Sequence, residues 1–406
     1  MIKELAPRPL KALKTVLDPN GQRLVLLEGP TGCNRDCSYC GDPKRFNTEK
    51  ASTLAQTKEQ IGWAYDQGFR TLQYVGGEPL APQFITNEGI TFVQHTLEVV
   101  RYASQKGMFV DVATNGDFVN EDILRELKEA GLDALTFSLH SRSEGALRHI
   151  IQSAKMAAKS RIIPIVSVVF TADRTDSIPE IARRCAENGI IFATTVVQEY
   201  GGFSAVPEKS QIPSPEQQRQ VFDVLIPLKR IGFVRNNMNY LKQAPDFPGN
   251  SWKCDPNKDS FVQISAEGEG EIGVCSEVHT KFKVGEIDLK EKEWRDVKRD
   301  LVHNCNNCLY SCTYESQNPN LRGDSTTLGV IAQIKSGNAE GVERYGQLAV
   351  RALDLVPDFE GTDRIFKPLL TNPIFLFLVQ SKGNQIQKKY ESKSLLEFLR
   401  RSYLGM

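Results

Sequence analysis

Short apolar runs alternate with amphipathic stretches from residue 22 to about residue 200. The runs are rich in branched and aromatic residues, as buried strands are, and the stretches between them repeat their apolar positions with a helical period. Such alternation is typical of β-α units around a parallel sheet. The pattern predicts strands at residues 23–27, 71–75, 108–113, 134–139, 163–170 and 190–197, and helices at residues 53–67, 90–105, 121–130, 143–159 and 178–187.

Six such units predict an α/β fold built on a partial (β/α)6 barrel, because a closed eight-stranded barrel would need two more units. A segment rich in glycine, proline and serine, residues 201–215, predicts a boundary. The helical pattern resumes at residues 216–230, where Pro227 predicts a kink or an early end. We therefore expect a leader at 1–21, a barrel at 22–200, a linker and helix at 201–250, a small domain at 251–315 and a mainly helical extension at 316–406.

Beyond the linker, apolar runs at residues 261–265 and 271–275 flank a glycine-bearing turn and predict a β-hairpin. A helix is expected at residues 293–301. In the helical extension, further helices are expected at 326–335, 339–355 and 395–403, with a short apolar run at 373–379.

Charge and cysteine content narrow the range of binding partners and the cellular compartment expected for the protein. The 406 residues include 50 basic and 50 acidic side chains, so no net field attracts nucleic acid or an anionic membrane. Neither a secretory signal nor an apolar membrane span opens the chain. We therefore expect no nucleic-acid or membrane partner, and a reducing cytoplasm for the nine cysteines.

Three cysteines, Cys33, Cys37 and Cys40, follow the first predicted strand with the spacing C-x3-C-x2-C. Loops at this end of a parallel barrel carry its functional groups. Three thiolates leave one iron of a four-iron cluster without a protein ligand, which suggests catalysis. Structural zinc commonly uses two C-x2-C pairs, and closed electron-transfer clusters use other spacings, so we weigh both below an open cluster.

The cysteine spacing, with Tyr39 before the last cysteine, resembles the signature of radical S-adenosylmethionine enzymes. The resemblance implies a six-unit open barrel and a [4Fe-4S] cluster on Cys33, Cys37 and Cys40. It also implies that S-adenosylmethionine (SAM) chelates the open iron, and that an electron from a donor such as flavodoxin or ferredoxin cleaves it to a 5′-deoxyadenosyl radical.

Later strand ends carry further residues that the resemblance assigns to the cofactor. Gly76-Gly77-Glu78-Pro79 resembles the family's GGEP motif, which binds the methionine amino group, and Thr114-Asn115-Gly116 resembles its TNG turn. His140 is a candidate acid or base, against the ordinary structural role of a lone histidine. The expected cofactor contacts are Tyr39, Gly76, Gly77, Glu78, Asn115 and Ser138.

A second cysteine group lies around the predicted hairpin and helix, and resembles the twitch or shortened SPASM extension of the same superfamily. Because a four-iron cluster needs four ligands, the group supports one auxiliary [4Fe-4S] cluster and one spare thiol. Cys312 either replaces a ligand or remains a candidate hydrogen donor, while structural zinc is the alternative metal. Cys185 is expected to be a buried apolar group. The five members are Cys254, Cys275, Cys305, Cys308 and Cys312, the first four being our first assignment.

Together these features predict an enzyme that abstracts hydrogen from a substrate carbon. Maturation of a ribosomally made peptide, by epimerisation, cross-linking or backbone rearrangement, ranks first. A radical SAM oxidoreductase or transferase acting on a sugar, nucleotide or other metabolite is the alternative, and a non-enzymatic electron carrier is more distant. Residues 1–21 are too few for a folded leader-binding domain, which weighs against a peptide substrate unless a separate protein presents the leader peptide.

Overall fold

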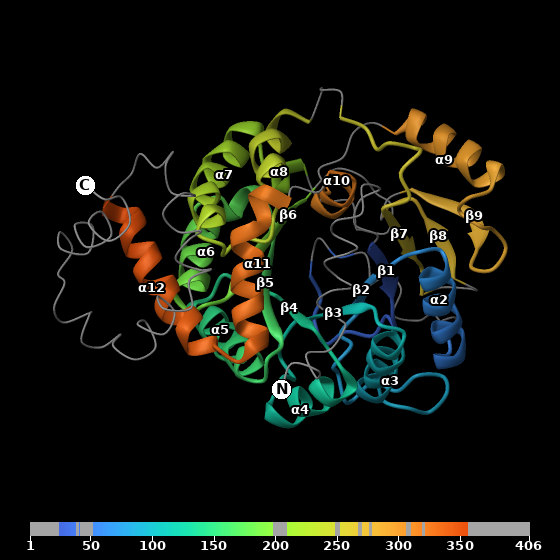
Figure 1. Cartoon of the computed structure of the whole chain (residues 1–406), viewed down its shortest axis with the longest axis horizontal. Coiled ribbons are helices and arrows are strands. Elements are labelled where there is room, and N and C mark those ends of the chain that lie inside the picture. Colours follow the sequence, from blue (N-terminus) through green and yellow to red (C-terminus); the bar gives the residue numbers. More distant parts are fainter. Residues whose placement is uncertain are drawn as a thin grey trace.

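A computed structural model describes residues 24–37, 40, 52–197, 209–247, 252–266, 270–275, 278–305, 310–318 and 321–355 (Figure 1). The expectations for Tyr39, Cys308 and residues 1–21, 373–379 and 395–403 lie outside this part of the chain.

One mixed sheet runs through the described part of the molecule (Figure 1), with strand order β6-β5-β4-β3-β2-β1-β7-β8-β9. The first six strands are parallel, and each end lies within one residue of its predicted position. The expected α/β partial barrel is therefore confirmed. These strands are β1 (Leu24–Glu28), β2 (Thr71–Val75), β3 (Phe109–Thr114), β4 (Ala134–Ser138), β5 (Ile163–Phe170) and β6 (Ile191–Val196).

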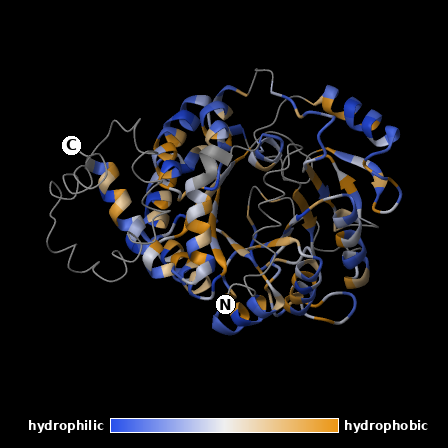
Figure 2. Cartoon of the chain, in the orientation of Figure 1, coloured by the Kyte–Doolittle hydropathy of each residue, from blue (hydrophilic) through white to orange (hydrophobic). Residues whose placement is uncertain are grey.

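Helices follow the strands as predicted and cover the outer face of the sheet. Local sequence sets their ends: Thr53 and Thr91 form capping boxes, and Gly131 ends a helix in the left-handed conformation. Their polar residues face outward, and apolar stripes turn towards the sheet (Figure 2). The helices are α2 (Leu54–Asp66), α3 (Phe92–Gln105), α4 (Glu121–Ala130), α5 (Glu144–Lys159) and α6 (Ser177–Glu187).

The two faces of the sheet differ in polarity. Val110 and Val112 of β3 are fully buried in the core beneath the helices, whereas Asp111 between them points to the other face. That inner face is partly open to solvent, since Gln73 of β2 and Ser138 of β4 are half-buried. The inside of the barrel is thus a polar, accessible surface.

The predicted hairpin is present, and it extends the barrel sheet. β7 (Phe261–Ile264) pairs with β1 in parallel, and β8 (Glu271–Gly273) returns antiparallel to β7. Its strands are shorter than predicted, and β9 (His279–Lys283), which we did not predict, adds to its edge. α9 (Lys292–Asn304) is longer than the expected helix at 293–301.

The remaining helices pack around this sheet. In α7 (Pro215–Arg230) the helix continues past Pro227, so the early end expected there is wrong; only the last turn follows the proline, where its missing amide interrupts little. The two short helices, α8 (Met238–Gln243) and α10 (Ser311–Gln317), were not predicted. No described helix is long and apolar enough to cross a membrane. The set is completed by α11 (Leu321–Ser336) and α12 (Ala339–Leu355).

Close contact between α12 and α6 gives a test of the fold. A Cβ atom on Gly346 of α12 would lie 1.9 Å from the carbonyl oxygen of Ala186, whereas one on Gly145 of α5 would meet open space. We expect Gly346→Ala to lower the free energy of unfolding by roughly 1–3 kcal/mol through overpacking. Gly145→Ala, the matched control, should leave it unchanged or raise it by up to about 1 kcal/mol. Urea titration followed by circular dichroism measures both, and equal effects would contradict this packing.

Candidate active site

The cysteine loop continues the pairing of β1 with β2 beyond the ends of both strands. The Gly77 amide donates to the carbonyl oxygen of Pro30 at 3.1 Å, and the Glu78 amide donates to that of Gly32 at 2.7 Å. A Cβ atom on Gly77 would lie 2.1 Å from the Gly32 oxygen. Only glycine fits here, because the second strand end lies directly against the backbone that leads into Cys33.

The Glu78 carboxylate joins the ends of β2 and β3. It is fully buried, and it accepts hydrogen bonds from the Thr114 hydroxyl at 2.6 Å, the Asn115 amide at 2.6 Å and the Leu80 amide at 3.0 Å. Burial raises the pKa of Glu78, and these donors oppose the rise. In this structure the carboxylate therefore holds the third strand end in place.

Asp117 binds the segment between the first two cysteines to the turn after β3. Its carboxylate accepts hydrogen bonds from two guanidinium nitrogens of Arg35, one of them Nε at 2.9 Å. It also accepts a hydrogen bond from Asn34 Nδ2 at 2.8 Å. Asn115 Nδ2 donates to Asn34 Oδ1 at 2.7 Å. Burial would raise the pKa of Asp117, but the bonds from Arg35 and Asn34 outweigh it and hold the pKa below its usual value.

The three amino-terminal cysteines are all half-buried on this anchored loop. The Arg35 amide donates to Cys33 Sγ at 3.4 Å, and the Cys40 amide donates to the Cys37 carbonyl oxygen at 2.9 Å. Within the described ranges, no three His, Cys, Asp or Glu side chains surround a single metal ion. An iron-sulfur cluster takes one thiolate on each iron, so its donor set is three separate sulfurs on one loop, as present here.

Ser138 and His140 lie where β4 ends. Ser138 is half-buried on the inner face, and the carbonyl oxygens of Leu139 and His140 both accept from the buried Arg174 guanidinium. Burial lowers the pKa of His140 to about 4, helped by the charges of Arg35 and Arg174. At neutral pH the His140 imidazole is therefore uncharged, which disfavours the acid role and leaves it able to accept a proton.

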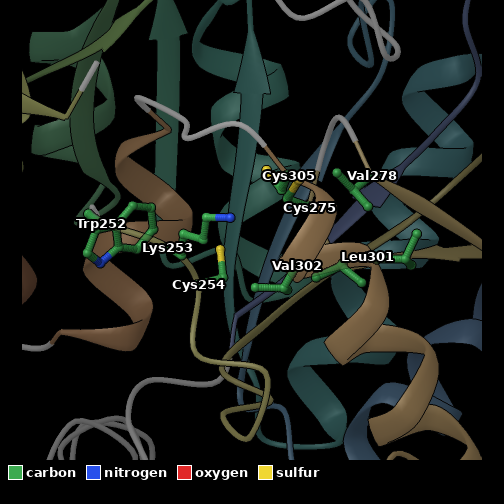
Figure 3. A pocket seen from close by; sticks show the side chains of 9 residues that line it. Trp252, Lys253, Cys254, Cys275, Val278, Leu301, Val302 and Cys305 are labelled. Atoms are coloured by element: carbon green, nitrogen blue, oxygen red, sulfur yellow. The ribbon is translucent and has the colours of Figure 1, made fainter. Parts of the chain in front are cut away.

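The described members of the second cysteine group gather at the hairpin. Cys254, Cys275 and Cys305 line one pocket (Figure 3). Cys312 of α10 packs against the small apolar cluster formed by Leu24, Phe261 and Cys275. Burial raises the pKa of Cys254 and of Cys312 to about 11. Cys185 lies apart from them, fully buried in α6.

Sequence reasoning missed three residues that shape this region: Arg35, Asp117 and Arg174. Arg35 and Asp117 are 82 residues apart, and Arg174 contacts carbonyl oxygens 34 and 35 residues away. The one available signal was the position of Asp117 directly after the Thr114-Asn115-Gly116 turn.

Comparison with known proteins identifies the barrel. The sequence model of the Radical SAM superfamily matches residues 27–197, from the end of β1 to just past β6. This segment, which is less than half of the chain, is similar to that superfamily. The matched segment contains the cysteine loop and the strand ends that meet it.

Several solved structures are similar to this chain. Streptococcus suis SuiB bound to the precursor peptide SuiA has a TM-score of 0.51 at 15% identity, covering 71% of this chain and 67% of that one. SuiB bound to S-adenosylmethionine has a TM-score of 0.50 at 16% identity, covering 71% of each chain. Native anSMEcpe with bound AdoMet has a TM-score of 0.49 at 12% identity, covering 79% of this chain and 99% of that one. The TM-scores of the two SuiB structures show a shared fold, and their low sequence identities show nothing beyond it.

The Arg35–Asp117 pair predicts a rigid cysteine loop. Asp117→Ala removes the acceptor for Asn34 and Arg35, so amide hydrogen exchange over residues 33–37 should accelerate roughly tenfold, given the usual strength of charged hydrogen bonds. Mass spectrometry of peptic fragments measures the rates. Asp122→Ala, which breaks the exposed Asp122–Arg125 pair on α4, is the matched control. Exchanging the two charges, Arg35→Asp with Asp117→Arg, should restore slow exchange; equal rates in Asp117→Ala and the control would contradict the anchor.

Proposed function

We propose that this protein is a radical SAM enzyme that cleaves S-adenosylmethionine reductively, abstracts hydrogen from a substrate carbon and matures a ribosomally made peptide. The observation that carries the proposal is the packing of the cysteine loop on the ends of β2 and β3. Gly77 brings one strand end against the loop, and Asp117 anchors the other. A rigid three-thiol loop at the mouth of an accessible barrel suits chemistry on a substrate that enters the barrel.

In this proposal Cys33, Cys37 and Cys40 hold a [4Fe-4S] cluster with one open iron. When bound, the cluster and S-adenosylmethionine supply an electron and a carbon-centred radical, with the electron coming from an external donor such as flavodoxin or ferredoxin. The chain binds and orients the cofactor and excludes water. The contacts proposed for S-adenosylmethionine, on the family resemblance, are Tyr39, Gly76, Gly77, Glu78, Asn115 and Ser138.

Glu78 has a positioning part in this scheme. Its carboxylate accepts a hydrogen bond from the Asn115 amide, so it fixes the position of the turn that carries the Asn115 side chain. Because Glu78 is fully buried against β3, it contacts a methionine amino group only if that group reaches the remaining acceptor position on the carboxylate. His140, which is uncharged at neutral pH, remains a candidate proton acceptor at the same edge.

An auxiliary [4Fe-4S] cluster on the second cysteine group completes the proposal. The gathering of Cys254, Cys275 and Cys305 around one pocket supports it, with Cys308 as our fourth ligand. Cys312 packs against the apolar cluster that contains Cys275, so it is the alternative ligand; otherwise it is a protonated thiol able to return hydrogen to a substrate radical. Structural zinc is the competing occupant, because the same thiolates bind either metal.

Peptide maturation ranks ahead of small-molecule chemistry because SuiB, which shares the fold, was solved with its precursor peptide SuiA. We propose that a separate leader-binding protein presents the peptide. Action on a sugar, nucleotide or other metabolite is the second candidate, supported by the polar inner face of the barrel, where Gln73, Asp111 and Ser138 offer hydrogen bonds. A precursor-peptide gene beside this gene would favour the first.

The central claim predicts cofactor cleavage that depends on the cysteine loop. Anaerobically reconstituted protein, reduced with dithionite and given S-adenosylmethionine, should form 5′-deoxyadenosine, measured by liquid chromatography. The variant with Cys33, Cys37 and Cys40 all changed to alanine should form none, while Cys185→Ala, in the buried core, should retain cleavage. Cleavage by the triple variant would overturn our cluster assignment; no cleavage by the wild type would favour an electron carrier.

The auxiliary cluster predicts a separate pool of iron. The triple variant should still hold about four irons per chain after reconstitution, since one four-iron cluster would remain on the later cysteines. Changing Cys254 and Cys275 to alanine should remove about four irons from the otherwise unaltered protein, whereas Cys185→Ala should remove none. Iron and zinc are counted by plasma mass spectrometry. If the triple variant held zinc and no residual iron, the result would contradict the auxiliary cluster and indicate a structural zinc site.

A further inference from the structure

A row of polar side chains crosses the inner face of the sheet. The strand register places Gln263 of β7, Leu26 of β1, Gln73 of β2 and Asp111 of β3 opposite one another. Neighbours in register point to the same face, so three polar groups share one level of the barrel. Parallel barrels ordinarily fill this level with branched apolar residues. A row of polar side chains at this level therefore indicates a surface that contacts a polar group.

Asp111 is the most enclosed member of the row. Only 1% of the residue is exposed, and its carboxylate accepts from the Thr136 hydroxyl at 2.8 Å and 3.0 Å and from Gln73 Nε2 at 3.1 Å. Arg235 Nη1 reaches the same carboxylate at 3.3 Å. Both oxygens of Asp111 are therefore occupied, and little capacity remains for a further donor.

Arg235 reaches Asp111 from the opposite side of the barrel. Its amide donates to the carbonyl oxygen of Phe192 at 2.7 Å, so the backbone of Arg235 runs beside β6. Strands β5 and β4 separate β6 from β3 in the sheet. The side chain thus crosses the inside of the open barrel, and the ion pair spans the level at which the polar row lies.

The two partners differ sharply in exposure. The Arg235 side chain is 37% exposed, whereas that of Asp111 is 2% exposed. Asp111 is the one acid that pairs with Arg235 within the described part of the chain. Glu315 on α10 accepts hydrogen bonds from the Asn237 amide at 2.8 Å and from Asn236. A guanidinium has five N–H donors, so most of those on Arg235 remain for a ligand.

We propose that Arg235 binds a substrate carboxylate on the floor of the barrel, with Asp111 as the residue that positions its guanidinium. The inference deepens the proposed function, on which it rests for the identity of the molecule as substrate. A planar guanidinium fixed on one side by an acid offers paired donors on the other, which is the geometry that recognises a carboxylate. The carboxylate belongs to a peptide or to a metabolite, and the two sources share this chemistry.

The competing explanation is that the Arg235–Asp111 ion pair is a structural strut, which only holds the two sides of the barrel together. A strut needs no accessible guanidinium, yet the Arg235 side chain is 37% exposed. The inner positions above the pair are also accessible, because Ala113, Ser138 and Ser167 on the neighbouring strands are half-buried. Asp111 lies three residues before the end of β3, roughly 10 Å below the mouth of the barrel. A ligand entering from the mouth would meet Arg235 at that depth.

Chemical modification of the wild-type protein tests accessibility without any variant. Phenylglyoxal should modify Arg235. N-acetylglycine at roughly tens of millimolar should slow this modification severalfold, as expected for a ligand with a dissociation constant of about a few millimolar. Peptide mass spectrometry resolves each arginine. Arg125, exposed on α4, should react at an unchanged rate, and Arg174, which is 5% exposed, should resist. No reaction at Arg235, or equal protection of Arg125, would overturn the proposal.

Direct binding compares carboxylates with an uncharged control. N-acetylglycine stands for a peptide carboxylate, succinate for a metabolite, and N-acetylglycinamide carries no charge; saturation-transfer NMR gives each dissociation constant. Arg235→Gln should weaken carboxylate binding roughly tenfold to a hundredfold, the usual worth of a charged hydrogen bond, and Arg235→Lys should weaken it less. Arg125→Gln should have no effect. Wild-type affinity in a folded Arg235→Gln protein, judged by circular dichroism, would sink the proposal.

Asp111→Asn separates a binding role from a strut. Asparagine keeps an acceptor for Thr136 and Arg235 but removes the competing negative charge, so N-acetylglycine should bind severalfold more tightly. A strut alone predicts lower stability with no gain in affinity. Tighter binding of N-acetylglycine than of succinate would assign the site to peptides, and the reverse to metabolites. Because these measurements use no S-adenosylmethionine, their failure would leave the 5′-deoxyadenosine test untouched, and failure of that test would leave them valid.

Discussion

The backbone pairing of β1 with β2 is the constraint on which the functional site depends. Because the pairing continues through Pro30 and Gly32 to Gly77 and Glu78, the cysteine loop leaves the sheet in a direction that the strands determine. A side chain at Gly77 would occupy the space of the Gly32 carbonyl group. The loop is thus placed by main-chain hydrogen bonds, which do not depend on any bound group.

Side chains from β3 then fix this loop from a second direction. Glu78 draws the end of β3 towards β2, and Asp117 binds Arg35 and Asn34 between the first two cysteines. A loop held only at its two ends would lose conformational entropy when it bound a cofactor. Three strand ends that share hydrogen bonds remove much of that cost before binding, which is the usual meaning of preorganisation.

The parallel core was predictable because its signals are local. The strand at residues 163–170 is a single, mostly apolar run, and the N-caps and glycines that bound the helices stand next to them in sequence. The pairing of β7 with β1 was not predictable, because the two strands are more than 230 residues apart and no short-range pattern specifies their register. The short helix α10 was missed for a related reason, since its packing partners come from distant segments.

The same distinction applies to the site. The cysteines, Gly77 and Asn115 stand in recognisable spacings, but Asp117 and Arg235 gain their meaning only from partners 82 and 124 residues away. β3 joins both arrangements, since Asp111 points into the barrel and Asn115 and Asp117 lie in the turn that follows the strand. A rigid strand therefore fixes the distance between the barrel floor and the cysteine loop. For the proposed radical reaction this matters, because a reactive carbon must be held at a set place relative to the group that attacks it.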